Sequence, residues 1–167
     1  MSITKLSGLS VLIVEDIRAM RAIIRTTLRN FGIEQVVEAS DGQAALDILR
    51  GRHIDVVITD ICMEPMDGIE FTRRLRQPDN GLNPYVPVLM VSGHTEVSRV
   101  KDALEAGVTA FLAKPVTPAN LQKKLMTIVE SSPQPVQTRT YCGPDRRRSS
   151  VRTRKRRRAS DNSVVNV

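Results

Sequence analysis

The feature that most constrains the fold is an alternation of short apolar runs with segments of helical periodicity. The runs are rich in β-branched side chains and too short for helices, which favours buried strands. They lie at residues 9–14, 36–39, 55–60, 86–91 and 109–113. Helical segments are predicted between and after them, at about 17–31, 42–50, 67–76, 97–106 and 118–129. This alternation predicts an α/β fold with a doubly wound, five-stranded parallel sheet.

The third run, Asp55-Val56-Val57-Ile58-Thr59-Asp60, carries the clearest functional signal because it ends in an acid. In open parallel sheets, functional groups gather at the carboxyl ends of the strands. Taken alone, Asp60 is equally consistent with a solvated acid at the start of the next turn. The ends of the other runs decide between these two interpretations.

Chemically active side chains also follow three other runs, namely Glu15-Asp16, Ser92 and Lys114. If the strands are parallel neighbours, one sheet edge gathers three carboxylates, a hydroxyl and an ammonium group. Each residue has a plainer role when taken singly: helix N-terminal charge, turn residue or surface cation. One shared site explains all four strand ends more simply than four unrelated roles.

The chemistry of this predicted edge favours a metal-assisted phosphoryl site. Clustered carboxylates repel one another, and burial raises their pKa values. A hard divalent cation relieves the repulsion, and oxygen ligands without a His or Cys cluster suit Mg²⁺. A carboxylate beside a cation and an ammonium group can be the nucleophile that forms an aspartyl-phosphate.

The chain has features of a protein from a reducing compartment, which we expect to be the cytoplasm. Cys62 and Cys142 lack metal-ligand spacing and do not indicate a disulfide framework. Residues 1–8 do not resemble a signal peptide, and no apolar run approaches the length of a membrane span.

Charge divides the chain into a body, residues 1–130, and a basic tail, residues 131–167. The tail holds ten Lys and Arg against two Asp and Glu, whereas the body has a net charge of −1. The tail has almost no apolar periodicity, so we expect it to be disordered. Residues 139–148 are less random, with Tyr141 and a Gly-Pro-Asp turn before three arginines. The tail is consistent with nonspecific polyanion contact, docking to an acidic protein, or dedicated nucleic-acid or membrane contact.

Together, these motifs resemble the receiver domain of two-component response regulators of the chemotaxis-regulator type. The resemblance covers about residues 9–130. It rests on Glu15-Asp16, on Asp60 with Met66-Asp67-Gly68, on Ser92-Gly93, and on Phe111-Leu112-Ala113-Lys114-Pro115. It implies a flavodoxin-like (βα)5 fold with strand order 2-1-3-4-5.

The resemblance also implies a role for each matching residue. Asp60 is similar to the phosphoacceptor, and Lys114 to the lysine that pairs with the phosphoryl group. The implied Mg²⁺ ligands are Asp16, Asp60 and the Cys62 main-chain carbonyl, with Glu15 acting through water. Ser92 and Phe111 resemble the switch pair, and Pro115 resembles the family's cis-proline.

Partners and output follow from the same resemblance. A sensor histidine kinase or phosphotransfer protein would supply the phosphoryl group, and the chain would promote only its own phosphotransfer and dephosphorylation. Output would pass to a protein partner through a face that includes Val97, Lys101, Phe111 and parts of 118–129. The chain departs from the family at Glu64, where a proline is usual and Pro65 follows instead. Cys62 and His94 occupy positions that tune phosphoryl lifetime in relatives.

Three other functions remain open from the sequence. An aspartyl phosphatase needs an acid-x-acid element after the first strand, whereas Glu15 and Asp16 are adjacent. A degenerate docking module would be expected to lose Asp60 or Lys114, and both are present. A nucleic-acid-associated regulator would act through the basic tail, whose charge provides contact without sequence readout.

Overall fold

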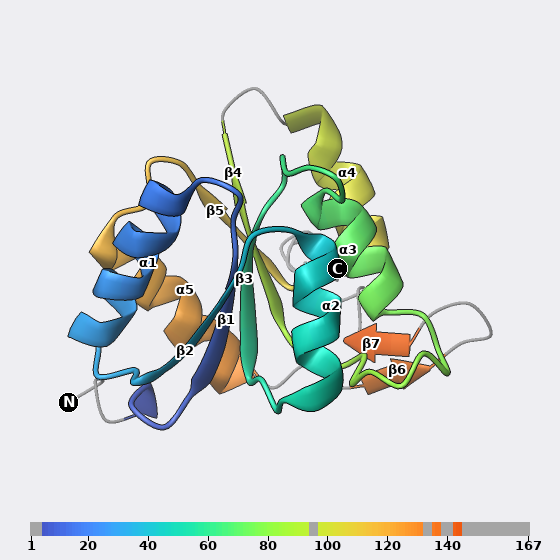
Figure 1. Cartoon of the computed structure of the whole chain (residues 1–167), viewed down its shortest axis with the longest axis horizontal. Coiled ribbons are helices and arrows are strands. Elements are labelled where there is room, and N and C mark those ends of the chain that lie inside the picture. The colour runs from blue at the N-terminus through green and yellow to red at the C-terminus, as the bar shows by residue number, and fades with distance from the viewer. Residues whose placement is uncertain (1–4, 94–96, 132–134, 138–141, 145–167) are drawn as a thin grey trace, which may run out of the picture.

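The structure, a computed structural model, describes residues 5–93, 97–131, 135–137 and 142–144. Its large sheet has five parallel strands in the order β2-β1-β3-β4-β5, which confirms the predicted fold (Figure 1). The strands are β1 Ser10–Val14, β2 Gln35–Ala39, β3 Val56–Asp60, β4 Val88–Ser92 and β5 Ala110–Ala113. The helices are α1 Arg18–Asn30, α2 Gly42–Gly51, α3 Gly68–Leu75, α4 Val97–Ala106 and α5 Pro118–Ser131.

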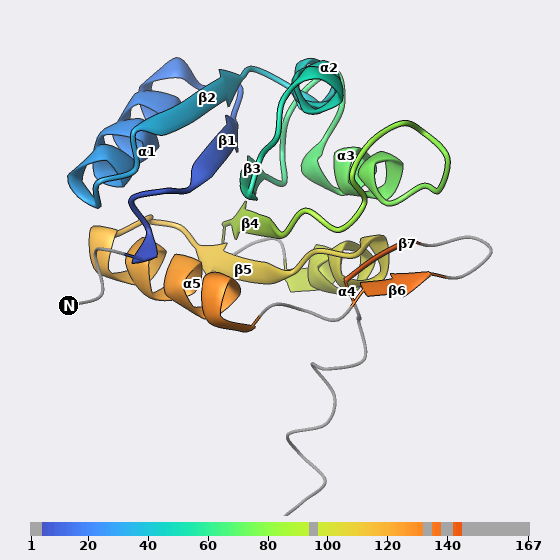
Figure 2. The same ribbon diagram turned by 90° about the horizontal axis from the view of Figure 1, so that it is seen from below.

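The sheet lies between two helical layers, with α1 and α5 on one face and α2, α3 and α4 on the other (Figure 2). The pleat of β1 sends Val11 and Ile13 to the first face and Leu12 and Val14 to the second. All four side chains are fully buried. The central strands therefore read as continuous apolar runs because both of their faces are covered.

The fourth strand differs from the predicted 86–91. It begins at Val88, after Pro87, and includes Ser92. Proline has no N–H to donate to a ladder, although the Pro87 carbonyl still accepts a hydrogen bond from Val57 N–H at 2.9 Å. The shift places Ser92 in the strand itself, at the carboxyl edge.

Two segments of the predicted tail form a small antiparallel sheet, where no regular structure was expected. The strands are β6 Pro135–Gln137 and β7 Cys142–Pro144. Pro135 and Pro144 pair at the end of this ladder, where a missing N–H is tolerated. Both views place the small sheet near the C-terminal end of α4 (Figures 1 and 2). The other predicted tail residues, 132–134, 138–141 and 145–167, lie outside the described residues.

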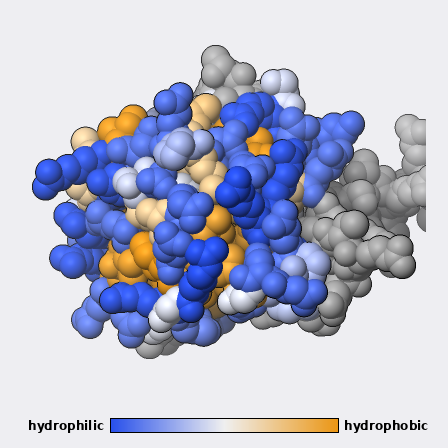
Figure 3. Space-filling model, turned by 45° about the vertical axis from the view of Figure 1, so that its right-hand side comes forward, coloured by the Kyte–Doolittle hydropathy of each residue, from blue (hydrophilic) through white to orange (hydrophobic). Residues whose placement is uncertain are grey.

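The outer surface is mainly polar. Figure 3 shows hydrophilic side chains over one face, with separate apolar patches between them. The large apolar side chains exposed in the described residues are Ile17, Ile23 and Leu104. Among the described helices, none combines the length and the apolar character needed to cross a membrane.

Candidate functional site

Parallel pairing of β1 with β3 brings the predicted acids together at the carboxyl edge. Glu15 and Asp16 follow β1, and Asp60 ends β3. One carboxylate oxygen of each lies within 4.8 Å of those of the other two. Residues 44 positions apart in the sequence thus form one acidic cluster, as the convergence of strand ends predicts.

Asp60 is almost fully enclosed, with 5% of its surface exposed. Its Oδ1 accepts a hydrogen bond from the Ile61 main-chain N–H at 2.8 Å. Its Oδ2 lies 3.0 Å from Lys114 Nζ, and the lysine side chain is 31% exposed. The carboxylate is therefore oriented from inside the protein, while the lysine reaches it from the solvent side.

Burial and neighbouring carboxylates disfavour the ionised form of Glu15. The side chain is 2% exposed, and this burial raises its pKa to about 7. A hydrogen bond from Ile17 N–H, at 3.1 Å, lowers the pKa, whereas neighbouring Asp16 and Asp60 raise it further. Two buried carboxylates and the exposed Asp16 are oxygen donors that suit a hard divalent cation. The residues present therefore fit the predicted Mg²⁺.

The end of β5 positions the lysine. Lys114 N–H donates to the Ser92 carbonyl at 2.8 Å, which continues the β4–β5 pairing for one more residue. The Lys114–Pro115 peptide bond is cis. Ser92 is half-buried, and Phe111 is half-buried against the apolar cluster under α2, α3 and α4. These positions suit the predicted switch pair, whose movement stays a prediction.

The loop after Asp60, residues 61–67, packs closely against the site. Gly68 N–H donates to the Ile61 carbonyl at 2.9 Å, closing the loop. A Cβ on Gly68 would overlap the Asp60 main-chain carbonyl and come within 3.2 Å of Thr59 Oγ1. Only glycine fits this approach without displacing the backbone. The unusual Glu64–Pro65 bond is cis, and Cys62 is exposed in the same loop. The role of the Cys62 carbonyl as a Mg²⁺ ligand stays a prediction.

Sequence reasoning missed Arg99, which contacts this loop from α4. Its Nη2 lies 2.5 Å from Asp67 Oδ2, and its Nη1 lies 4.0 Å from Cys62 Sγ. Asp67 and Arg99 are 32 residues apart and belong to different elements, so no local periodicity could have paired them. His94, predicted beside the site, lies outside the described residues.

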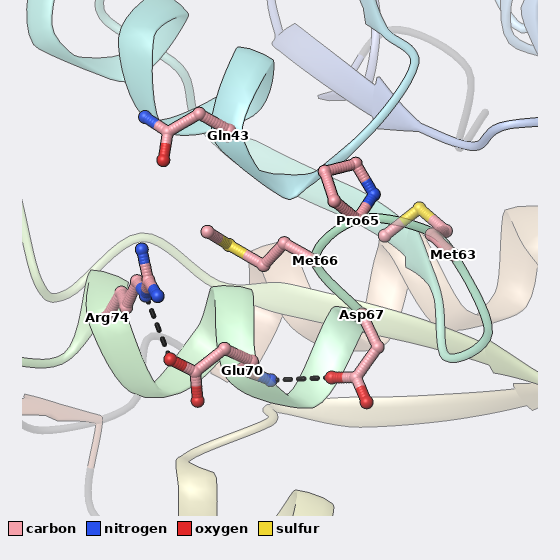
Figure 4. A pocket seen from close by; sticks show the side chains of 7 residues that line it. All are labelled: Gln43, Met63, Pro65, Met66, Asp67, Glu70 and Arg74. Atoms are coloured by element: carbon pink, nitrogen blue, oxygen red, sulfur yellow. Dashed lines mark hydrogen bonds and ion pairs between the residues drawn. The ribbon is translucent and has the colours of Figure 1, made fainter.

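A hollow of about 460 Å³ flanks the same loop (Figure 4). Met63, Pro65 and Met66 contribute its apolar lining, and Glu70 and Arg74 of α3 form an ion pair at 2.8 Å. Met63 and Met66 are each almost fully buried. The motif residues Glu15, Asp16 and Asp60 do not line it.

The fold, the acidic cluster and the facing lysine define a phosphoryl-accepting signalling domain of the two-component type. The model of the response regulator receiver domain matches residues 11–126, and the chain belongs to this family. It is therefore a signalling receiver rather than a conventional enzyme. Receiver domains bind Mg²⁺ at an acidic pocket, and this chain has such a cluster.

Its relatives include chemotaxis regulators. The chain is 37% identical over 123 residues to chemotaxis protein CheY-3 of Vibrio cholerae, covering 74% of this chain and 93% of that protein. Identity is also 37% to chemotaxis protein CheY of Pseudomonas aeruginosa, over 73% of this chain and 97% of that one.

Solved structures agree with this assignment. Vibrio cholerae CheY4 aligns with a TM-score of 0.64 at 30% identity, covering 72% of this chain and 98% of that one. The receiver domain of the Pseudomonas aeruginosa sensor histidine kinase PA1611 aligns with a TM-score of 0.66 at 29% identity. That alignment covers 74% of this chain and 99% of the other, whose active-site cleft coordinates a magnesium ion.

Proposed function

We propose that Asp60 accepts a phosphoryl group and that this charge change switches the domain between two states. The observation that carries the proposal is the setting of its carboxylate. The group is buried, held by Ile61 N–H through one oxygen and faced by Lys114 Nζ at the other. A carboxylate fixed in this way is pre-oriented for attack, and the lysine stands where negative charge would develop.

The donor is a phosphohistidine of a sensor histidine kinase or phosphotransfer protein. An Asp60 carboxylate oxygen forms the new O–P bond as the donor's N–P bond breaks. The imidazole leaves with the bonding electron pair and takes up a proton. Water later attacks the phosphorus, the Asp60 O–P bond breaks, and the carboxylate is restored as orthophosphate leaves. The chain thus promotes only its own phosphorylation and dephosphorylation.

Glu15, Asp16, Asp60 and the Cys62 carbonyl would hold Mg²⁺. When bound, this ion neutralises part of the charge on the phosphoryl group. Lys114, whose Nζ lies 3.0 Å from Asp60 Oδ2, would neutralise a further part. Ser92 would donate its hydroxyl to a phosphoryl oxygen, and Phe111 would follow into the space that Ser92 leaves. The change would reach a partner protein through the face formed by α4, β5 and α5.

Intact mass measured after incubation with Mg²⁺ and acetyl phosphate tests this proposal. We expect one phosphoryl adduct on the wild type, none on Asp60→Asn, and none in excess chelator. Asp47→Asn is the matched control because Asp47 lies on the exposed surface of α2 and pairs with Arg50. An adduct that persists in Asp60→Asn would place the acceptor elsewhere, and none on the wild type would contradict the acceptor role.

We also propose the division into a receiver, residues 1–130, and a basic tail, residues 131–167. The family match, residues 11–126, supports the first part, and the tail's net charge of +8 supports weak polyanion contact. Binding to duplex DNA should then weaken steeply as salt rises, and the removal of residues 145–167 should abolish it. Salt-independent binding would argue against charge contact.

A further inference from the structure

Asp67 uses its two carboxylate oxygens for two different elements. Oδ1 accepts a hydrogen bond from Glu70 N–H at 2.8 Å and so caps α3, as Figure 4 shows. Oδ2 binds Arg99 Nη2 of α4 at 2.5 Å. A single side chain therefore fixes the start of α3 and receives a cation from the neighbouring helix.

The pKa values of both partners reflect this contact. Partial burial alone would raise the pKa of Asp67, but the hydrogen bonds from Glu70 N–H and Arg99 hold it below its usual value. The same hydrogen bond to Asp67 raises the pKa of Arg99. Both groups therefore stay charged at neutral pH, and the ion pair persists there.

The pair acts on the loop that follows Asp60. Asp67 is the last residue of this loop, and the next N–H, that of Gly68, donates to the Ile61 carbonyl. Ile61 N–H in turn holds Asp60 Oδ1 at 2.8 Å. Arg99 also approaches Cys62 Sγ at 4.0 Å, so it contacts the loop at both of its ends. A short chain of contacts thus leads from α4 to the proposed acceptor.

We propose that Arg99 is a positioning residue, which holds the 61–67 loop and the Cys62 carbonyl at the proposed cation site by binding Asp67. The inference rests on the proposed function of this site and adds a residue from outside its motifs. Through Arg99, binding of a partner at α4 and binding of Mg²⁺ at the cation site are thermodynamically coupled. A partner that moves the first turn of α4 changes the affinity for Mg²⁺, and bound Mg²⁺ changes the affinity for that partner equally.

Calorimetric titration of the full chain with Mg²⁺ tests the inference without relying on phosphorylation. Arg99→Ala should weaken Mg²⁺ binding by about two- to fivefold, the range for a partly exposed ion pair. Asp67→Asn should have a similar effect, because it keeps an oxygen for the cap of α3 but removes the charge. The double variant should bind no more weakly than either single variant, and Arg99→Lys should lie between wild type and Arg99→Ala.

Arg74→Ala is the matched control. Its side chain is 47% exposed, against 36% for Arg99, and pairs at 2.8 Å with Glu70, but both residues belong to α3. Its Mg²⁺ affinity should equal that of the wild type. Urea unfolding of each variant shows whether it is folded under the conditions of the titration.

Separate outcomes bear on the two proposals. Wild-type Mg²⁺ affinity in folded Arg99→Ala, or fully additive effects in the double variant, would overturn the positioning role. An Arg99→Ala defect in phosphorylation that disappears at saturating Mg²⁺ would support it, because only cation binding is then impaired. A wild type that binds Mg²⁺ but gains no phosphoryl adduct would defeat the acceptor role of Asp60 and leave the positioning role intact.

Discussion

Charged side chains are buried at both ends of the parallel sheet, but their surroundings are opposite in kind. At the carboxyl edge, Glu15 is 2% exposed and Asp60 is 5% exposed, and each has other carboxylates nearby. At the amino edge, Arg76 is also 2% exposed, directly after α3. Burial of charge is costly in either place unless the group finds partners.

Arg76 is surrounded by carbonyl oxygens. Its Nη1 donates to the Pro84 carbonyl at 2.6 Å, and its Nη2 to the Gly107 carbonyl at 3.1 Å. Gly107 directly follows α4 and has a positive φ of 102°. The guanidinium thus lies at the negative end of one helix and ties it to the 77–86 loop.

The contrast separates a structural use of buried charge from a chemical one. Arg76 donates to one buried and one partly buried main-chain carbonyl, so its charge stabilises the fold. Glu15 and Asp60 add repulsion to burial, which lowers stability. Lys114 offsets part of this at Asp60, and a bound cation would offset more. Each of the following substitutions tests one side of this comparison.

The largest effect is expected at Arg76. Arg76→Met should lower the free energy of unfolding by about 3 kcal/mol, since a buried carbonyl and a partly buried one lose this donor. Urea denaturation measures this loss. Exposed Arg73→Met, on α3, is the control and is expected within about 0.5 kcal/mol of wild type. A loss below about 0.5 kcal/mol for Arg76→Met would contradict the stabilising role of the Arg76 charge.

Gly68 tests how closely the loop must approach the acceptor. Gly68→Ala should lower the free energy of unfolding by about 2 kcal/mol, because its Cβ meets the Asp60 carbonyl. Gly51→Ala is the control: apart from its chain neighbours and the backbone of its own helix, no atom lies within 4 Å of its added Cβ. It should be neutral or slightly stabilising. Equal denaturation midpoints for the two variants would contradict the close packing.

The smallest effect is expected at Glu15, and it has the opposite sign. In chelator, Glu15→Gln should raise the free energy of unfolding by about 1 kcal/mol, because a buried charge is removed while an oxygen still accepts from Ile17 N–H. Added Mg²⁺ should narrow the difference in free energy of unfolding between Glu15→Gln and wild type, because it stabilises the wild type more than the variant. Exposed Glu64→Gln serves as control. Destabilisation by Glu15→Gln in chelator would show that this charge supports the fold.

Much of the fold and the acidic cluster could be predicted because the signals are local. Each buried strand is a short β-branched run, and the acids stand directly after the runs that carry them. The parallel sheet then makes strand ends neighbours, which unites Glu15, Asp16 and Asp60 without knowledge of any side-chain contact. The start of β4 was predicted two residues early because the apolar pattern of Val86 and Pro87 hides the missing N–H.

The sequence by itself determined the succession of strands and helices along the chain, the acids at the strand ends and the uneven distribution of charge. Tertiary structure alone decided that Arg76 is buried rather than a surface cation at the end of a helix. It also decided that Arg99 binds Asp67, and that residues 135–137 pair with 142–144. The physical reason is the range of the interactions. Periodicity indicates which face of a helix or strand is buried. The partner of a long cationic side chain depends instead on which groups tertiary packing brings within its reach.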